Sequence, residues 1–235
     1  MSARNPSPLR ALLPMLGLLL GALMTGCATT SRIIEPLPEG RPFAKDINAF
    51  TGADATNPPP CSAILFIGSS SIRLWKTLAQ DLPDLRVINR GFGGSQIIDS
   101  VNHADRIVFP YRPRHIVMYA GGNGINAKKS PQQVFADFQA FVAKVHSELP
   151  RTKISYISIA PNPARWAQVD KVREANRLIE EFTRHDRRLA FIDVFSHMLG
   201  SDGQPLPDIY VTDRLHMNPK GYEIWKSVVG PHLRR

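Results

Sequence analysis

The stretch "AILFIGSSSIRLW" (residues 63–75) joins an apolar run to three consecutive serines. The run is short, almost continuously apolar and rich in isoleucine, as expected for a strand buried on both faces of a parallel sheet. Serines after such a strand have two explanations. Their hydroxyl groups cap the turn into a helix, or one of them is a nucleophile. The stretch alone favours the cap, and the rest of the chain has to decide between the two.

Four similar apolar runs follow and alternate with longer amphipathic stretches. This alternation predicts an α/β fold, a doubly wound, three-layer α/β/α sandwich with a five-stranded parallel sheet of the flavodoxin-like kind. The five predicted strands are 62–68, 86–91, 114–121, 153–160 and 189–195, and the predicted helices are 71–80, part of 97–107, 130–149, 168–185 and 219–229.

The first 26 residues have the features of an export signal. Two arginines precede the short apolar run "ALLPMLGLLLGALM" (11–24), which ends in "MTGCATT" (24–30). The last segment resembles the lipobox of bacterial lipoproteins, and this resemblance implies lipidation of Cys27. A plain cleaved signal or an uncleaved anchor is the alternative. We expect a lipid-anchored protein of the bacterial envelope, with Ala28 indicating the outer membrane and its periplasmic side by analogy with sorting signals.

The sequence after the signal divides into a linker and a domain. Residues 27–60 are polar and proline-bearing, and we interpret them as a tether with a short packing helix around 43–50. Residues 61–235 form the predicted domain. With Cys27 lipidated, Cys61 has no second cysteine in the chain to pair with, so the hydrophobic core has to hold the fold. The membrane, through the anchor, is one expected partner.

The net charge of +9 favours anionic surfaces but does not identify one. The chain has no long basic run and no zinc-type spacing of cysteine and histidine, so we expect no nucleic acid partner. Of the histidines outside "VTDRLHMNPKGY" (211–222), none has ligand spacing with another, and we expect neither a metal nor a cofactor. The oligomeric state stays open.

"VTDRLHMNPKGY" carries a candidate acid and base. Asp213 precedes His216 by three residues, so one turn brings the carboxylate to the imidazole. Asn218 and Pro219 are a strong helix start, which places His216 on the loop before the last helix. A local hydrogen bond without catalytic meaning is an equally good explanation of Asp213 and His216 alone.

Two glycine-rich segments at predicted strand ends are candidates for holding an oxyanion. They are "NRGFGGSQ" (89–96) and "YAGGNGIN" (119–126). A glycine allows close approach of a backbone N–H to a reacting atom, and an asparagine side chain supplies another N–H. In a parallel sheet both segments meet the serines at the carboxyl edge.

The order of these four blocks resembles that of the SGNH hydrolases, also called GDSL-type esterases, over residues 61–235. By position the resemblance implies Ser70 as nucleophile and Asp213 and His216 as acid and base. It implies an oxyanion hole made by the Ser70 and Gly94 backbones and the Asn123 side chain, with Asn126 a weaker contender. The implied reaction is metal-independent hydrolysis of carboxylic esters of lipids, acylated carbohydrates or small acyl groups through an acyl-enzyme.

The sequence departs from the family pattern at two positions, because Ser69 and Gly124 stand where aspartates are usual. Glycine at 124 is expected to loosen the loop that carries Asn123. The departures keep a catalytically weak or inactive binding lipoprotein open, and an acyltransferase shares the same acyl-enzyme. "PNPARW" (161–166) follows the fourth strand, so Arg165 and Trp166 are candidates for binding substrate, while a purely structural Trp166 is as good an explanation.

Overall fold

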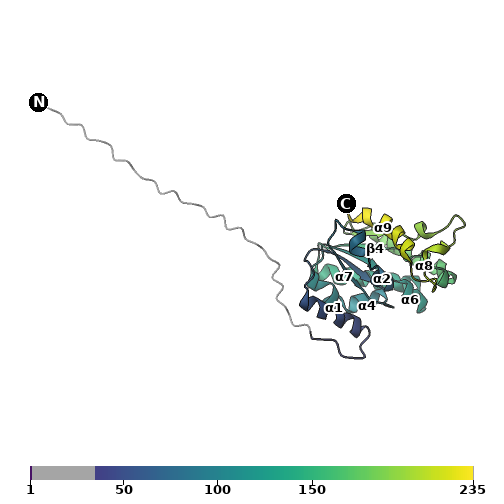
Figure 1. Cartoon of the computed structure of the whole chain (residues 1–235), viewed down its shortest axis with the longest axis horizontal. Coiled ribbons are helices and arrows are strands. Elements are labelled where there is room, and N and C mark those ends of the chain that lie inside the picture. The colour runs from purple at the N-terminus through teal and green to yellow at the C-terminus, as the bar shows by residue number, and fades with distance from the viewer. Residues whose placement is uncertain (2–34, 235) are drawn as a thin grey trace. The chain divides into compact units, whose positions relative to one another are not determined.

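Five strands form one parallel sheet in the order β2-β1-β3-β4-β5. The computed structural model describes residue 1 and residues 35–234. It confirms the predicted three-layer α/β sandwich with its five-stranded parallel sheet (Figure 1). The strands are β1 (Ile64–Gly68), β2 (Val87–Gly91), β3 (His115–Tyr119), β4 (Lys153–Ile157) and β5 (Leu189–Ile192).

Alternate residues of each strand enter two separate cores. Leu65 and Ile67 of β1 face one core, and Ile64 and Phe66 face the other, because successive side chains of a strand point to opposite faces. Helices on either side of the sheet supply the remaining residues of each core. The sheet is therefore covered on both faces, which explains the continuous apolar character of its strands.

The helices are as follows. On the first face lie α1 (Ala44–Thr56), α4 (Ile97–Asn102), α5 (Ala104–Ile107), α7 (Pro131–Glu148) and α8 (Val169–Thr183), with the short α6 (Gly122–Asn126) after β3. On the other face lie α2 (Ser70–Leu74), α3 (Leu78–Asp81) and α9 (Pro219–Leu233). Four 3-10 helices are η1 (Phe109–Tyr111), η2 (Pro163–Gln168), η3 (Ser196–Met198) and η4 (Pro207–Ile209).

Two predicted helices are each divided in the structure. The predicted helix 71–80 breaks at Trp75 into α2 and α3, and 97–107 breaks at His103 into α4 and α5. At the first break the Trp75 ring is buried and its indole N–H donates to Asp81 at 2.7 Å. The helix stops here because the Trp75 ring is buried against the sheet and its N–H needs an acceptor. The periodicity of the sequence does not reveal this break.

Helix α1 is fastened to the edge strand β2 by a polar cluster. The Arg90 guanidinium forms an ion pair with Asp54 and also donates to the Tyr111 hydroxyl at 2.7 Å, while that hydroxyl donates to Asp54 at 2.6 Å. Ile47 of α1 is fully buried in the first core. The structure thus includes α1, which begins before the predicted boundary at Cys61, in the same packed unit as the sheet.

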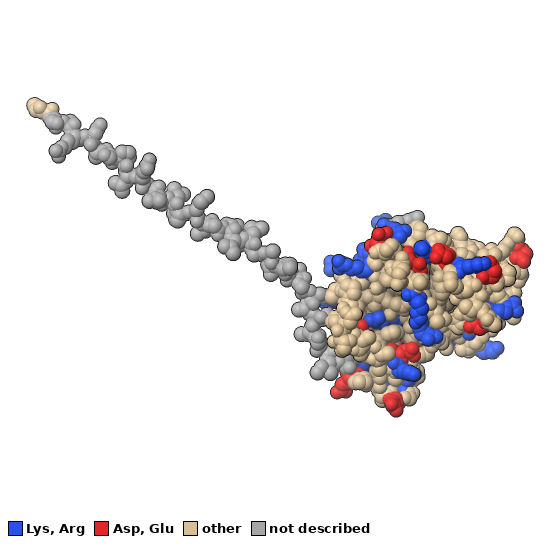
Figure 2. All heavy atoms as spheres, viewed as in Figure 1, with Lys and Arg blue, Asp and Glu red and all other residues tan. Residues whose placement is uncertain are grey.

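The predicted signal and Cys27 lie outside the described residues, so the structure does not test them. Within residues 35–234, no helix is both long and apolar enough to span a membrane. On the face drawn in Figure 2, lysines and arginines are interspersed with acidic side chains, so the positive charge of the chain does not gather in one patch there.

The chain adds β2 on one side of β1 and then crosses to add β3 on the other side. The order of strands therefore reverses at β1, although all strands remain parallel. Such switch points leave a crevice at the carboxyl ends of the strands. An aromatic cluster supports this crevice from the second face: Trp225 of α9 packs edge-to-face on Trp75 and Tyr119, with ring centroids 5.8 and 4.7 Å apart. The Tyr222 hydroxyl donates to the Ser71 carbonyl at 2.8 Å.

The first prediction concerns this cluster. Trp225→Ala should lower the free energy of unfolding by about 3–5 kcal/mol, because it removes a fully buried ring and leaves a cavity. Urea unfolding followed by circular dichroism measures the change. Ser227→Ala, on the exposed side of the same helix, should stay within about 0.5 kcal/mol of the parent. A loss below about 1 kcal/mol for Trp225→Ala would contradict the packing described.

Candidate active site

Ser70 is presented at the carboxyl end of β1 by a turn that only glycine can make. Gly68 has φ +132°, and a Cβ there would lie 1.9 Å from the Tyr119 carbonyl oxygen. The Ser69 N–H donates to that same oxygen at 2.9 Å, so the β1 backbone leaves the sheet in contact with β3. Ser70 then begins α2 with a half-buried side chain.

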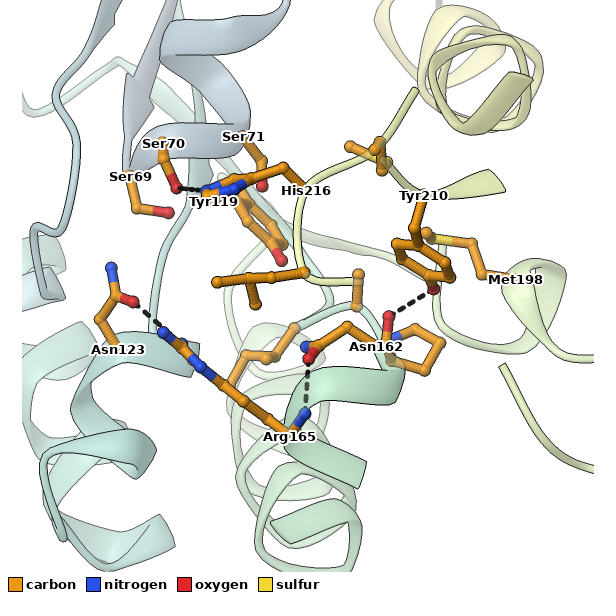
Figure 3. A pocket seen from close by; sticks show the side chains of 16 residues that line it. Ser69, Ser70, Ser71, Tyr119, Asn123, Asn162, Arg165, Met198, Tyr210 and His216 are labelled. Atoms are coloured by element: carbon orange, nitrogen blue, oxygen red, sulfur yellow. Dashed lines mark hydrogen bonds between the residues drawn. The ribbon is translucent and has the colours of Figure 1, made fainter. Parts of the chain in front are cut away.

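His216 approaches Ser70 from a loop 146 residues further along the chain. Its Nε2 lies 2.8 Å from the Ser70 Oγ (Figure 3). The loop is tight, because Arg214 adopts a left-handed φ of +56° and the Val211 N–H donates to the His216 carbonyl. The loop ends where the Asn218 side chain caps α9, so His216 stands just before the last helix as predicted.

Asp213 fixes the orientation of the His216 ring. Its Oδ2 lies 2.6 Å from Nδ1, and its Oδ1 accepts the backbone N–H groups of Leu215 and His216 at 2.8 and 2.9 Å. A carboxylate only accepts, so Nδ1 carries the proton and Nε2 is left to accept from the Ser70 hydroxyl. The three side chains form a continuous relay of hydrogen bonds, the arrangement that removes a proton from a serine nucleophile.

The same contacts keep Asp213 ionised. Burial raises the pKa of its carboxyl, but hydrogen bonds from the His216 N–H, the imidazole and the Leu215 N–H lower the pKa more, to about 2. Its side chain is 47% exposed, and that of His216 is 25% exposed. The acid is therefore accessible to water but stays charged at neutral pH.

Of the predicted oxyanion donors, Ser70 and Asn123 line the same pocket. The Ser70 N–H is at the first position of α2, where no intrahelical acceptor exists. Asn123, on α6 after β3, donates through Nδ2 to the Ser95 carbonyl at 3.0 Å, next to Gly94 in the chain. Gly94 has φ +79° in the loop between β2 and α4 and does not line the pocket beside Ser70. Asn126 points elsewhere, since its oxygen accepts from Gln168 at 3.5 Å.

The pocket beside Ser70 is small. Its volume of about 40 Å³ is room for about three water molecules. Arg165 is the one lysine, arginine or acidic residue in the lining, whereas Trp166 does not line the pocket and packs against the Arg173 guanidinium. The lining residues are Ser69, Ser70, Ser71, Tyr119, Gly122, Asn123, Ile159, Ala160, Pro161, Asn162, Arg165, Met198, Tyr210, Leu215, His216 and Met217.

The sequence alone did not single out Asn162, Tyr210 and Met198, which also line the pocket. Asn162 accepts the Arg165 N–H at 2.9 Å and caps η2, Tyr210 donates to the Pro161 carbonyl at 2.6 Å, and Met198 packs near Tyr210 (Figure 3). The Asn-Pro pair at 162–163 is a helix-start signal that pointed to Asn162. No local signal points to Tyr210 or Met198, because they reach the pocket from the segment between β5 and α9.

Within residues 1 and 35–234, no group of three or more histidine, cysteine, aspartate and glutamate side chains is placed to hold a metal ion.

Comparison with known proteins identifies the family. The model of the GDSL-like lipase/acylhydrolase family matches residues 68–224. The chain belongs to this family. The match spans the segment from the glycine before the serines to the last helix, and so includes every candidate residue from Ser70 to His216.

Solved structures agree on the fold of this GDSL-like chain. A Streptococcus pneumonia protein named for platelet activating factor has TM-score 0.71 at 23% identity, over 80% of this chain and 91% of its own. A GDSL-like lipase from Bacteroides thetaiotaomicron has TM-score 0.70 at 17% identity, over 80% and 97%. A carbohydrate esterase family 3 protein from Talaromyces cellulolyticus has TM-score 0.61 at 15% identity, over 73% and 95%. The comparison with curated proteins found no match.

The two departures from the GDSL-like pattern have distinct surroundings. Ser69 is the residue before α2, but its hydroxyl does not cap that helix. Gly124 is buried inside α6, and a Cβ there would lie 3.3 Å from Val134, so little room exists for an aspartate. Backbone bonds from Ile125 to the Gly121 carbonyl and from Lys129 to the Gly124 carbonyl hold this short helix in place.

The second prediction follows from the low pKa of Asp213. A carboxyl whose pKa is lower in the folded protein contributes stability above its unfolded pKa, about 3.9, and loses it as the pH falls toward about 2. The difference in free energy of unfolding between the parent and Asp213→Asn should therefore shrink from pH 5 to pH 2. Asp202→Asn, on an exposed turn, is the control. A difference that is constant over this range would contradict the lowered pKa.

Proposed function

We propose that the chain is a serine esterase that hydrolyses esters of short acyl groups. The observation that carries the proposal is the relay from Asp213 through His216 to Ser70, with contacts of 2.6 and 2.8 Å, at the wall of a pocket of about 40 Å³. Membership in a family of lipases and acylhydrolases supports it. The roles of the individual residues are part of the proposal.

In the first half-reaction, Ser70 Oγ attacks the acyl carbon while His216 Nε2 takes the hydroxyl proton. The negative charge of Asp213 stabilises the imidazolium that forms. His216 then gives the proton to the leaving alcohol as the carbon–oxygen bond breaks, which leaves the acyl group on Ser70.

In the second half-reaction, water replaces the alcohol. His216 takes a proton from the water as it attacks the acyl carbon, and returns it to Ser70 Oγ when the acid leaves. Both tetrahedral intermediates carry an oxyanion. The backbone N–H groups of Ser70 and Gly94 and the Asn123 amide are the proposed donors to it, and losing one such donor costs about 10²–10³ in rate.

The pocket volume supports a short acyl group. Space for about three water molecules matches the few heavy atoms of an acetyl or propionyl group better than those of an octanoyl chain. Met198 and Tyr210, two large side chains, line the pocket on the side away from Asn123 (Figure 3). The carbohydrate esterase among the structural neighbours suggests that sugars be tested as the alcohol part of the ester.

The third prediction tests nucleophile and acyl group together. Residues 35–235 are assayed on p-nitrophenyl acetate, butyrate and octanoate. We expect acetate to exceed octanoate in kcat/KM by about 10² or more, since even a single methylene that does not fit costs about 10-fold or more. Ser70→Ala should lose at least about 10³ in kcat on every ester. Ser147→Ala, exposed on α7, is the matched control.

The same assay distinguishes an esterase from a binding lipoprotein and from an acyltransferase. Equal background rates for the parent and Ser70→Ala would favour a binding lipoprotein over an enzyme. Acyl transfer to an added alcohol in preference to water would favour an acyltransferase. An octanoate preference would contradict the short-acyl part of the proposal while leaving the nucleophile in place.

We also propose that Cys27 is lipidated and anchors the domain to the bacterial envelope, facing the periplasm. The support is the sequence alone, through the apolar run 11–24 and "MTGCATT" (24–30). The linker between Cys27 and α1 would then separate the active site from the membrane.

The fourth prediction tests this anchor. The full chain expressed in a Gram-negative bacterium should incorporate an alkyne-tagged fatty acid and fractionate with the outer membrane. Cys27→Ala should lose both the label and the membrane association, whereas Cys61→Ala should keep them. A labelled Cys27→Ala protein, or an unlabelled parent that is exported and cleaved, would contradict lipidation.

A further inference from the structure

One of the two N–H groups of the Asn123 amide and its oxygen already have hydrogen-bond partners. Its Oδ1 accepts from Arg165 at 3.0 Å (Figure 3). Its Nδ2 donates one hydrogen to the Ser95 carbonyl at 3.0 Å. An asparagine amide has two N–H groups. The one N–H left over is therefore the group available to an oxyanion at Ser70.

These two neighbours determine which way the amide faces. If the amide were flipped, its NH₂ group would face the Arg165 guanidinium, which has only donors, and its oxygen would face the Ser95 carbonyl, which only accepts. Both contacts would become repulsive. Ser95 contributes one of the two constraints, and Arg165 contributes the other with a charge-assisted bond.

Arg165 is itself held in place from two sides. Its backbone N–H donates to Asn162, the residue that begins η2, at 2.9 Å. The adjacent Ala164 N–H donates to the Arg214 carbonyl at 3.1 Å, which ties η2 to the loop of Asp213 and His216. Through these contacts η2 links the loop that carries His216 to α6, which carries the Asn123 amide.

The surroundings of Arg165 indicate why it faces the amide. No ion pair to a carboxylate is formed by its guanidinium among residues 35–234, and no acidic side chain lines the pocket. Partial burial lowers the pKa of the guanidinium, in keeping with a cation that lacks a carboxylate partner. The charged guanidinium of Arg165 therefore acts on the neutral amide of Asn123 and orients it.

We propose that Arg165 is a positioning residue that orients the Asn123 amide toward the oxyanion. This inference rests on the proposed esterase function, because it assigns Arg165 a part in the same reaction. It also gives a physical reason why the chain can carry glycine at position 124. Asn123 is oriented by a contact from η2, 42 residues further along the chain, and does not depend on the residue that follows it.

The fifth prediction is a double-mutant cycle with p-nitrophenyl acetate. Arg165→Met should lower kcat by about 10- to 100-fold with less than a twofold change in KM, because a misaligned donor affects the transition state more than substrate binding. In the Asn123→Ala background the same substitution should cost less than about twofold. Arg165→Lys, which keeps the positive charge and N–H donors, should recover part of kcat. Arg177→Met, exposed on α8, is the matched control and should leave kcat unchanged.

Additive losses in the cycle would overturn the proposal, since Arg165 would then act on the substrate or the oxyanion directly. A large rise in KM with unchanged kcat would overturn it as well. Thermal unfolding of each variant shows whether a loss of kcat comes from misfolding. If Arg165→Met does not fold, the cycle is measured with Arg165→Lys in its place.

A measurement that needs no activity completes the test. The side-chain NH₂ signal of Asn123, assigned by its absence in Asn123→Ala, should show a lower ¹⁵N order parameter in Arg165→Met, while the backbone amides of α6 keep theirs. An unchanged side-chain order parameter would overturn the proposal. Should the parent protein not hydrolyse esters, this readout still decides the role of Arg165, so the failure of either proposal is recognised separately.

Discussion

At the carboxyl ends of β1 and β3 the two backbones are so close that a Cβ on Gly68 would overlap the Tyr119 carbonyl. That carbonyl accepts the Ser69 N–H, and Ser70 opens the next helix. The same strand, β3, leads into α6 and Asn123. One contact between adjacent strands therefore sets the relative position of the candidate nucleophile and the candidate amide donor. Ser70 and Asn123 are therefore both positioned by adjacent strands of the same parallel sheet.

The candidate base comes from far away in the chain and depends on a different support. His216 stands on a turn that Asn218 joins to α9, and α9 is packed on the sheet through Trp225 and on α2 through Tyr222. Ser70 and His216 meet because α2 and α9 share one buried aromatic cluster. The position of the relay is thus decided by packing that lies beneath it, on the second face of the sheet.

Sequence reasoning reached the strands, the sheet class and the residues at the strand ends, because burial on both faces leaves an unmistakable apolar pattern. It also reached the Asp213–His216 pair, since three residues of separation and a following Asn-Pro are local signals. It did not reach the breaks at Trp75 and His103, the roles of Asn162 and Tyr210, or the contact from Arg165 to Asn123. Each of these depends on side chains from distant segments meeting in space, and no periodicity encodes such meetings. Trp166, named beside Arg165 because the two are adjacent in the chain, packs instead on Arg173.

The cluster that fastens α1 to β2 has a consequence for how the protein behaves at high concentration. β2 is an edge strand, and an open edge offers its backbone groups to a strand from another molecule. Here the Asn89 side chain accepts the Gly91 N–H at 2.9 Å, and Arg90 donates to the Asn89 carbonyl at 2.9 Å while it pairs with Asp54 of α1. Side chains therefore occupy two of the backbone groups that a docking strand would use, the Gly91 N–H and the Asn89 carbonyl. This end of the edge, nearest the nucleophile turn, is less open to sheet extension and aggregation than a bare edge.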